Sequence, residues 1–185
     1  MRSRICDFEL LVDSARFKSS HAPESATLSL GMLQFRMIMD FLETKGIQYE
    51  LAQHAPVYTS YEAARVRGVD ASSGVKALVL KLQSNEFIIA LVPGDKRADI
   101  NKLAKILNAK KVSLAKPDEV LKITGCEIGS VHPFGNLAGL QTYMDRGILK
   151  NERVEFSAGL HTVSVRIASP DLVNMTKPHI ADFSL

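Results

Sequence analysis

The sequence predicts a single domain of mixed α and β structure, and three observations support this fold class. Its 185 residues, with 46% hydrophobic and 23% charged, fall in the usual range for one globular domain with a sizeable core. Segments with a helical hydrophobic period alternate with short runs rich in β-branched and apolar residues. The chain has no internal repeat, so a repeat architecture is not expected.

The first part of the chain differs from the rest. It lacks a clear hydrophobic period and contains a polar stretch at residues 18–25. We therefore expect an N-terminal extension over residues 1–32 and a domain over residues 33–185. Either Met32 or Met37 is an alternative start of the protein.

The domain is expected to begin with a helix, a strand and a second helix. Apolar residues recur at helical spacing over residues 33–45, and Gly46 follows as a residue that tolerates positive φ. A short strand is predicted at residues 49–52. Residues 59–62 have the spacing of a capping box, and the short helix that they begin is closed by Gly68.

A β-hairpin is predicted in the middle of the chain. Residues 75–82 and 86–92 are rich in β-branched and apolar side chains, and the polar residues 83–85 separate them. The proline and glycine at residues 93–94 end the second strand.

Helices and strands continue to alternate in the second half. An apolar stripe over residues 100–107 predicts a helix, and Pro117 opens another that stops at Gly125. Ser169 and Pro170 begin a last short helix. Three further strands are predicted at residues 140–144, 153–156 and 162–167.

Composition restricts the location of the protein. No apolar run approaches the ~20 residues that cross a bilayer, and the N-terminal residues do not resemble a secretory signal. The two cysteines, Cys6 and Cys126, do not suggest a disulfide framework. We expect a cytoplasmic protein that does not bind membranes.

Positive charge is concentrated in one segment. Residues 96–122 carry eight basic and three acidic residues, a local charge of +5. Such a basic band suits a phosphate-rich partner, although lysines also cover helix faces for solubility. Its basic members are Lys96, Arg97, Lys102, Lys105, Lys110, Lys111, Lys116 and Lys122.

Three features are candidates for chemistry. Lys76 enters an apolar strand on the face of Leu78 and Leu80, where it is either a cation at a cleft or a lysine that reaches water. Residues 129–135 (GSVHPFG) place glycines around a proline turn, which suits either an oxyanion-binding loop or a tight connection. His161 begins a strand after a glycine turn, and such a histidine has either a functional role, through its titratable ring, or a structural one.

Other kinds of site are not favoured. Ser73 and Lys76 have the SxxK spacing of acyl-enzyme hydrolases, but residues three apart on a strand point to opposite faces. The five histidines lack HxH or HExxH spacing, and no Walker loop is present, so neither a metal nor a cofactor is expected.

Four segments in order resemble the YbaK family, whose members are similar to the editing insertion of bacterial prolyl-tRNA synthetase. They are TSYEAA at residues 59–64, Lys76 before ALVL, GSVHPFG at residues 129–135, and SAGLHTVSVRIASPDL at residues 157–172. The resemblance covers about residues 37–175. It implies a compact α/β domain with a curved mixed sheet, whose cleft accepts the aminoacylated 3′ end of tRNA and hydrolyses its ester.

The resemblance also implies roles for particular residues. Lys76 matches the lysine needed for activity, and its ammonium would hold the terminal phosphate or orient the ester. The family uses no Ser-His-Asp triad, so positioning, oxyanion stabilisation and a ribose hydroxyl would carry the reaction. The role of His132, at a variable position, is open. The implied substrate-binding residues are Tyr58, Thr59, Gly129, Ser130, Val131, His132, Pro133, Phe134, Gly135, Gly159 and His161.

The expected substrate is a small amino acid, such as alanine or cysteine, on tRNA(Pro). A separate hydrolytic pocket is needed because one methylene changes binding by only ~1–3 kcal/mol. Pocket size would depend on the packing of Tyr58, Val131, His132 and Phe134. The expected partners are tRNA and prolyl-tRNA synthetase, and not DNA. A non-catalytic module that binds tRNA ends or a synthetase is the main alternative.

Overall fold

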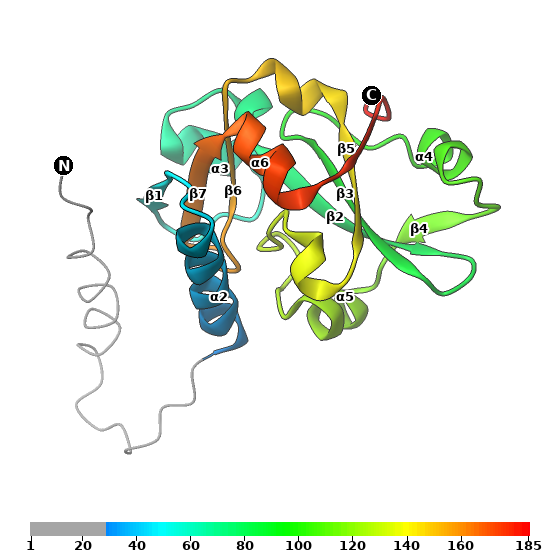
Figure 1. Ribbon diagram of the computed structural model, residues 1–185, viewed down its shortest axis with the longest axis horizontal. Helices are drawn as coiled ribbons and strands as arrows, with labels where there is room; N and C mark the ends of the chain where they lie inside the picture. Colours follow the sequence, from blue (N-terminus) through cyan, green and yellow to red (C-terminus); the bar gives the residue numbers. More distant parts are fainter. Residues whose placement is uncertain (1–28) are drawn as a thin grey trace.

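The structure is a computed structural model that describes residues 29–185 (Figure 1). Most of the predicted extension, together with Cys6, lies outside the described residues, so the division at residue 32 stays a prediction. The first described helix, α2 (Leu30–Thr44), begins three residues before the predicted start. Ser29 caps this helix, because its hydroxyl accepts a hydrogen bond from the amide of Met32.

The strands form two sheets that lie beside each other (Figure 1). The larger sheet has the order β4-β2-β3-β5-β8 and is mixed, because β3, β5 and β8 pair in parallel and the other pairs are antiparallel. The smaller sheet is antiparallel, with the order β1-β7-β6. The strands are β1 (Glu50–Gln53), β2 (Val75–Leu82), β3 (Phe87–Pro93), β4 (Val112–Leu114), β5 (Gln141–Asp145), β6 (Arg153–Ser157), β7 (Val163–Ala168) and β8 (His179–Ala181).

This arrangement confirms the predicted α/β class. The mixed sheet is present, and the smaller sheet joins it through a bridge between Gly74 and Glu155. All three strands predicted for the second half and the hairpin are confirmed to within one residue at each end. The sequence reading missed β4 and β8, which are only three residues long and give no pattern from which to recognise a strand.

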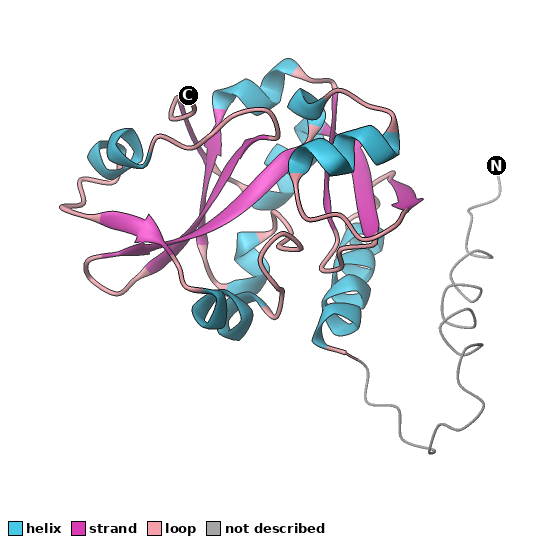
Figure 2. Ribbon diagram, turned by 180° about the vertical axis from the view of Figure 1, so that it is seen from behind, coloured by secondary structure: helices cyan, strands magenta, loops and turns pink. Residues whose placement is uncertain are grey.

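Helices cover the sheets on both sides (Figure 2). The helices α3 (Ser60–Arg67) and α5 (Pro117–Thr124) end at Gly68 and Gly125, both with φ of +68°. The predicted capping box of α3 is confirmed. The remaining helices are α4 (Ile100–Ile106) and α6 (Ser169–Thr176), with short 3₁₀ turns at Ala71–Ser73, Gly135–Ala138 and Arg146–Lys150.

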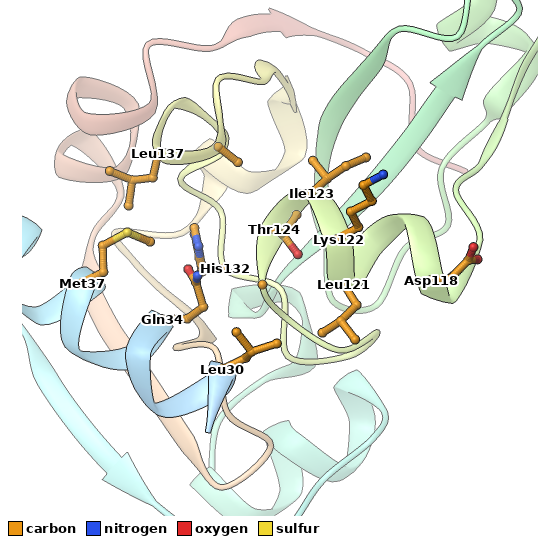
Figure 3. A pocket seen from close by; sticks show the side chains of 12 residues that line it. Leu30, Gln34, Met37, Asp118, Leu121, Lys122, Ile123, Thr124, His132 and Leu137 are labelled. Carbon is orange, nitrogen blue, oxygen red and sulfur yellow. The ribbon is translucent and has the colours of Figure 1, made fainter. Parts of the chain in front are cut away.

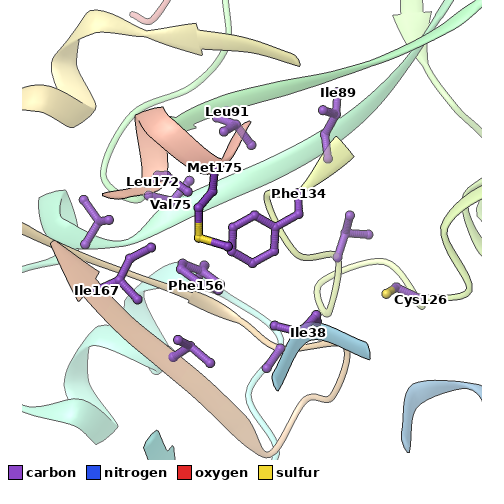
Figure 4. Packing of buried hydrophobic residues seen from close by; sticks show 14 of the residues in the cluster. Ile38, Val75, Ile89, Leu91, Cys126, Phe134, Phe156, Ile167, Leu172 and Met175 are labelled. Atoms are coloured by element: carbon purple, nitrogen blue, oxygen red, sulfur yellow. The ribbon is translucent and has the colours of Figure 1, made fainter. Parts of the chain in front are cut away.

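The main core lies among the two sheets, α2, α6 and the glycine loop (Figure 4). Alternation along β2 directs Val75 and Val79 into this core, whereas Leu80 packs with α4 in a second cluster on the opposite face. Lys76 has the same parity as Leu80. It therefore lies on the face of β2 that the sequence predicted.

None of the helices in residues 29–185 is long and apolar enough to span a membrane.

Candidate functional site

Strand β6 joins the two parts of the candidate site. Gly74, immediately before β2, forms its bridge with Glu155 of β6. Two residues further along β6, the hydroxyl of Ser157 donates a hydrogen bond to the carbonyl of Gly129, 3.2 Å away. The start of β2, which carries Lys76, and the glycine loop are therefore both held by the same short strand.

Gly129 is at the exposed end of the glycine loop, which spans residues 129–135. Its φ of +92° strains any residue with a side chain, and a Cβ atom would lie 3.2 Å from Cε1 of His161. Its amide makes no hydrogen bond to any of the residues from 29 onward. The loop therefore presents a free backbone N–H beside the His161 ring.

His161 is held by contacts from two segments. Its Nδ1 lies 3.2 Å from the carbonyl of Val57, and its Nε2 lies 3.3 Å from a carboxylate oxygen of Glu127. The Val57 carbonyl can only accept, so Nδ1 is the donor in that hydrogen bond. The Tyr58 ring packs on the other side, with centroids 4.7 Å apart. These contacts fix the orientation of the His161 ring beside Gly129.

Gly159 fixes the loop against the first helix. Its amide donates to the carbonyl of Ser130 at 3.1 Å, and its φ is +83°. A Cβ atom on Gly159 would lie 2.8 Å from Cβ of Gln34 on α2. Gly129 and Gly159, two of the three glycines in the family motifs, are thus both required by their backbone geometry.

The second half of the glycine loop faces the core. Phe134 is fully buried and packs edge to face against Phe156 (Figure 4). It makes the same kind of contact with Phe41. Val131, Pro133 and Gly135 are buried with it, and a Cβ on Gly135 would lie 2.4 Å from a methyl group of Ile89. These residues support the loop from behind, whereas Tyr58, Gly129 and His161 form its accessible side.

His132 is a buried neutral residue. Its Nδ1 accepts a hydrogen bond from the amide of Phe134 at 3.2 Å, which requires the proton to be on Nε2. Burial lowers the pKa of His132 to about 4, so the ring carries no charge at neutral pH. The contact gives this histidine a role in shaping the loop.

Lys76 does not contact the glycine loop or His161. Its ammonium donates instead to the carbonyl of Lys96, in the turn after β3. Burial lowers the pKa of the Lys76 ammonium, Asp95 opposes this effect and Arg97 adds to it. Lys76 therefore lies on the face of β2 opposite the core that holds the glycine loop, and the structure does not bring its amine to Gly129 or His161.

Two alternative nucleophiles are not supported by the geometry. The hydroxyl of Ser73 donates to the carbonyl of Asp70 at 2.7 Å, and it makes no contact with Lys76. Cys126 is fully buried, and burial raises the pKa of its thiol to about 11, so it stays protonated. Among residues 29–185, no group of three or more His, Cys, Asp or Glu side chains is arranged to hold a metal.

A cavity lies between α2 and α5, next to His132 of the glycine loop (Figure 3). It has a volume of about 590 Å³ and is lined mostly by apolar groups. Gln34 and His132 are polar residues in its wall, and the side-chain oxygen of Gln34 is buried with no hydrogen-bond partner in the described part of the chain. Tyr58, Gly129 and His161 are not among the residues that line this cavity.

Comparison with known proteins identifies the fold. The sequence profile of the aminoacyl-tRNA editing domain matches residues 54–175, which is more than half of the chain. The chain belongs to the aminoacyl-tRNA editing domain family. Tyr58, Lys76, the glycine loop, Gly159 and His161 all lie within the matched range.

Individual members of the editing domain family are similar over most of this chain. The Ser/Thr-tRNA deacylase ProXp-y of Escherichia coli is 26% identical over 160 residues, which are 84% of this chain and 96% of that protein. A crystal structure described as a candidate trans-editing enzyme for prolyl-tRNA synthetase superposes with a TM-score of 0.75 at 27% identity, covering 82% of this chain and 97% of the other. Proline–tRNA ligase of Fervidobacterium nodosum is 34% identical over 59% of this chain and 18% of its own length.

The editing domain carries an exposed basic surface. The eight basic residues of the band are all exposed, and none forms an ion pair with an acidic residue in the described range. They extend from the turn after β3 over α4 and β4 to α5, whose C-terminal end leads into the glycine loop. Their charges are therefore available to a polyanion that reaches the site.

Sequence reasoning missed two residues that shape the site, Glu127 and Ser157. Glu127 pairs with His161, and Ser157 donates to Gly129. Both contacts join residues about thirty positions apart, so no local spacing could indicate them.

Proposed function

We propose that this editing domain hydrolyses the ester bond of mischarged aminoacyl-tRNA in the cytoplasm. The observation that carries the proposal is the free amide of Gly129 beside the His161 ring, which Val57 and Glu127 hold in place, within a member of this family. A carbonyl oxygen that bound at this point would meet a backbone donor. This donor would stabilise the oxyanion that forms when water attacks the ester.

Lys76 supplies a cation in the proposed mechanism. Because it does not contact the glycine loop, its ammonium would have to leave the carbonyl of Lys96 to hold a phosphate of the terminal nucleotide or orient the ester. The described site offers no free base. Both ring nitrogens of His161 contact other residues, and His132 is buried with its Nδ1 bonded to the amide of Phe134. A ribose hydroxyl of the tRNA would orient the attacking water, and positioning of the ester would supply much of the rate.

The substrate is proposed to be a small amino acid on a tRNA, with prolyl-tRNA synthetase as a further partner. The similarity to a Ser/Thr-tRNA deacylase extends the expected alanine and cysteine to hydroxylated side chains. The similarity to a segment of a proline–tRNA ligase supports tRNA(Pro) as the carrier. Val131 and Phe134 are buried in the core, so they affect the size of the amino-acid pocket only through the shape of the glycine loop.

The test is release of amino acid from tRNA(Pro) charged with alanine, cysteine, serine or threonine. We expect wild type to release at least one of them, and Lys76→Ala to lower turnover by about 100-fold, the scale of one lost stabilising group. Lys45→Ala, at an exposed position after α2, is the control and should not change turnover. Unchanged turnover in Lys76→Ala would remove this residue from the mechanism. No release from any substrate would favour the non-catalytic binding module.

A further inference from the structure

Tyr58 is an exposed aromatic residue at the edge of the site. Its side chain is 69% exposed, and its ring lies on that of His161 with a tilt of 38° between the planes. The carbonyl of Tyr58 lies 3.7 Å from the position of a Cβ on Gly129. The Tyr58 ring therefore has one side against His161 and the other toward solvent, next to the free amide of Gly129.

The backbone around Tyr58 is held firmly. The amide of Val57 donates to the carbonyl of His161, and the carbonyl of Val57 accepts from the His161 ring. On the other side, the amides of Tyr58 and Thr59 both donate to the carboxylate of Glu62. A tyrosine has two side-chain torsions, so a ring on this fixed backbone loses little entropy when it binds a ligand.

We propose that Tyr58 is a stacking platform for the terminal adenine of the tRNA, an inference that rests on the proposed function. A flat base needs only an exposed π-face, which Tyr58 offers, whereas a small amino-acid side chain needs an enclosed pocket. The adenine is attached to the same ribose as the ester. A base on Tyr58 would therefore bring the ester carbonyl to Gly129. This assigns Tyr58 to the nucleotide and removes it from the amino-acid pocket.

Model esters test the platform through hydrolysis. The two substrates are the 3′-aminoacyl ester of adenosine and the same ester of 1-O-methyl ribose, with the amino acid that wild type releases fastest. Wild type should prefer the adenosine ester, and Tyr58→Ala should reduce this preference by about 5- to 150-fold, as expected for one stacked base. Tyr58→Phe should retain the preference. Tyr61→Ala is the matched control, since Tyr61 is 66% exposed on α3 and has no contact with His161. An unchanged preference in Tyr58→Ala would overturn the proposal.

Fluorescence tests the platform without hydrolysis. The chain has no tryptophan, so Tyr58→Trp introduces a single reporter at this position. An RNA minihelix that ends in CCA should quench its emission, and the same minihelix with an abasic last nucleotide should not. Equal quenching by both RNAs, or by neither at concentrations that bind the protein, would reject base stacking at Tyr58. Tyr61→Trp should show no difference between the two RNAs. Because this readout needs no turnover, it separates failure of the platform from failure of the proposed reaction.

Discussion

A Cβ atom on Gly129 would lie 3.2 Å from Cε1 of His161, closer than an ordinary van der Waals contact. The backbone of Gly129 has a φ of +92°, which strains any other residue. The same glycine accepts a hydrogen bond from Ser157 through its carbonyl and leaves its amide free. Any side chain here would disturb both the loop and the histidine that share the proposed oxyanion site.

Replacement of Gly129 by alanine should therefore reduce the rate of deacylation, in addition to lowering the stability of the fold. We expect Gly129→Ala to lower kcat at least tenfold through displacement of His161, and to destabilise the fold by about 1–3 kcal/mol through backbone strain. Gly139→Ala is the control, because Gly139 has φ of +68° but no atom within 4 Å of the added methyl. Both variants should lose stability, measured by urea unfolding, but only Gly129→Ala should lose activity. Equal activity in the two variants would show that Gly129 does not contribute to the reaction.

The sequence predicted those structural features that depend on residues close together in the chain. The capping box at Thr59, the glycine that ends α5 and the alternation along β2 each depend on neighbours within a few residues. The family motifs also located the loop and the histidine that the structure brings together at Gly129 and His161.

Tertiary contacts limited what could be predicted about the site. The sequence placed Lys76 on the correct face of its strand, but the direction of its amine depends on the carbonyl of Lys96, twenty residues away. Phe134 has the same hydrophobic character in a pocket wall as in a core, and only its packing with Phe41 and Phe156 places it in the core. The partner of His161, Glu127, is likewise set by folding.

Burial of His132 should make stability depend on pH. The pKa of His132 is about 4 in the folded protein and near 6.5 when unfolded, so the unfolded state binds the proton more tightly. This contribution to stability is complete above about pH 6.5 and is lost as the pH falls toward 4, by up to about 3 kcal/mol. In His132→Asn, the side-chain oxygen can accept the Phe134 amide without titrating. Urea unfolding between pH 4 and 7 should therefore show a shallower loss for His132→Asn. His179→Asn, at an exposed position, should retain the wild-type slope.

The ion pair between Arg67 and Glu155 should contribute strongly to stability. The atoms are 3.0 Å apart, and the side chains are only 9% and 3% exposed. Glu155→Gln leaves the buried Arg67 cation without its counter-charge, which should cost about 3–5 kcal/mol. The exposed pair of Arg146 and Asp182 provides the control, since Asp182→Asn should change the unfolding midpoint little. Similar midpoints for the two variants would show that Arg67 finds another partner or reaches water.

The basic band should give tRNA binding a steep dependence on salt. Each phosphate that a lysine neutralises contributes a slope of about −0.7 to −0.9 to the plot of log affinity against log salt. Lys116 precedes α5 and Lys122 lies in its last turn, and both are exposed. Because α5 leads into the glycine loop, we expect these lysines to meet the acceptor end of the tRNA. The double variant Lys116→Ala and Lys122→Ala should reduce the magnitude of the slope by about 2. Lys45→Ala, at the far end of α2, should leave the slope unchanged. A wild-type affinity that does not vary with salt would mean that the band faces away from the RNA.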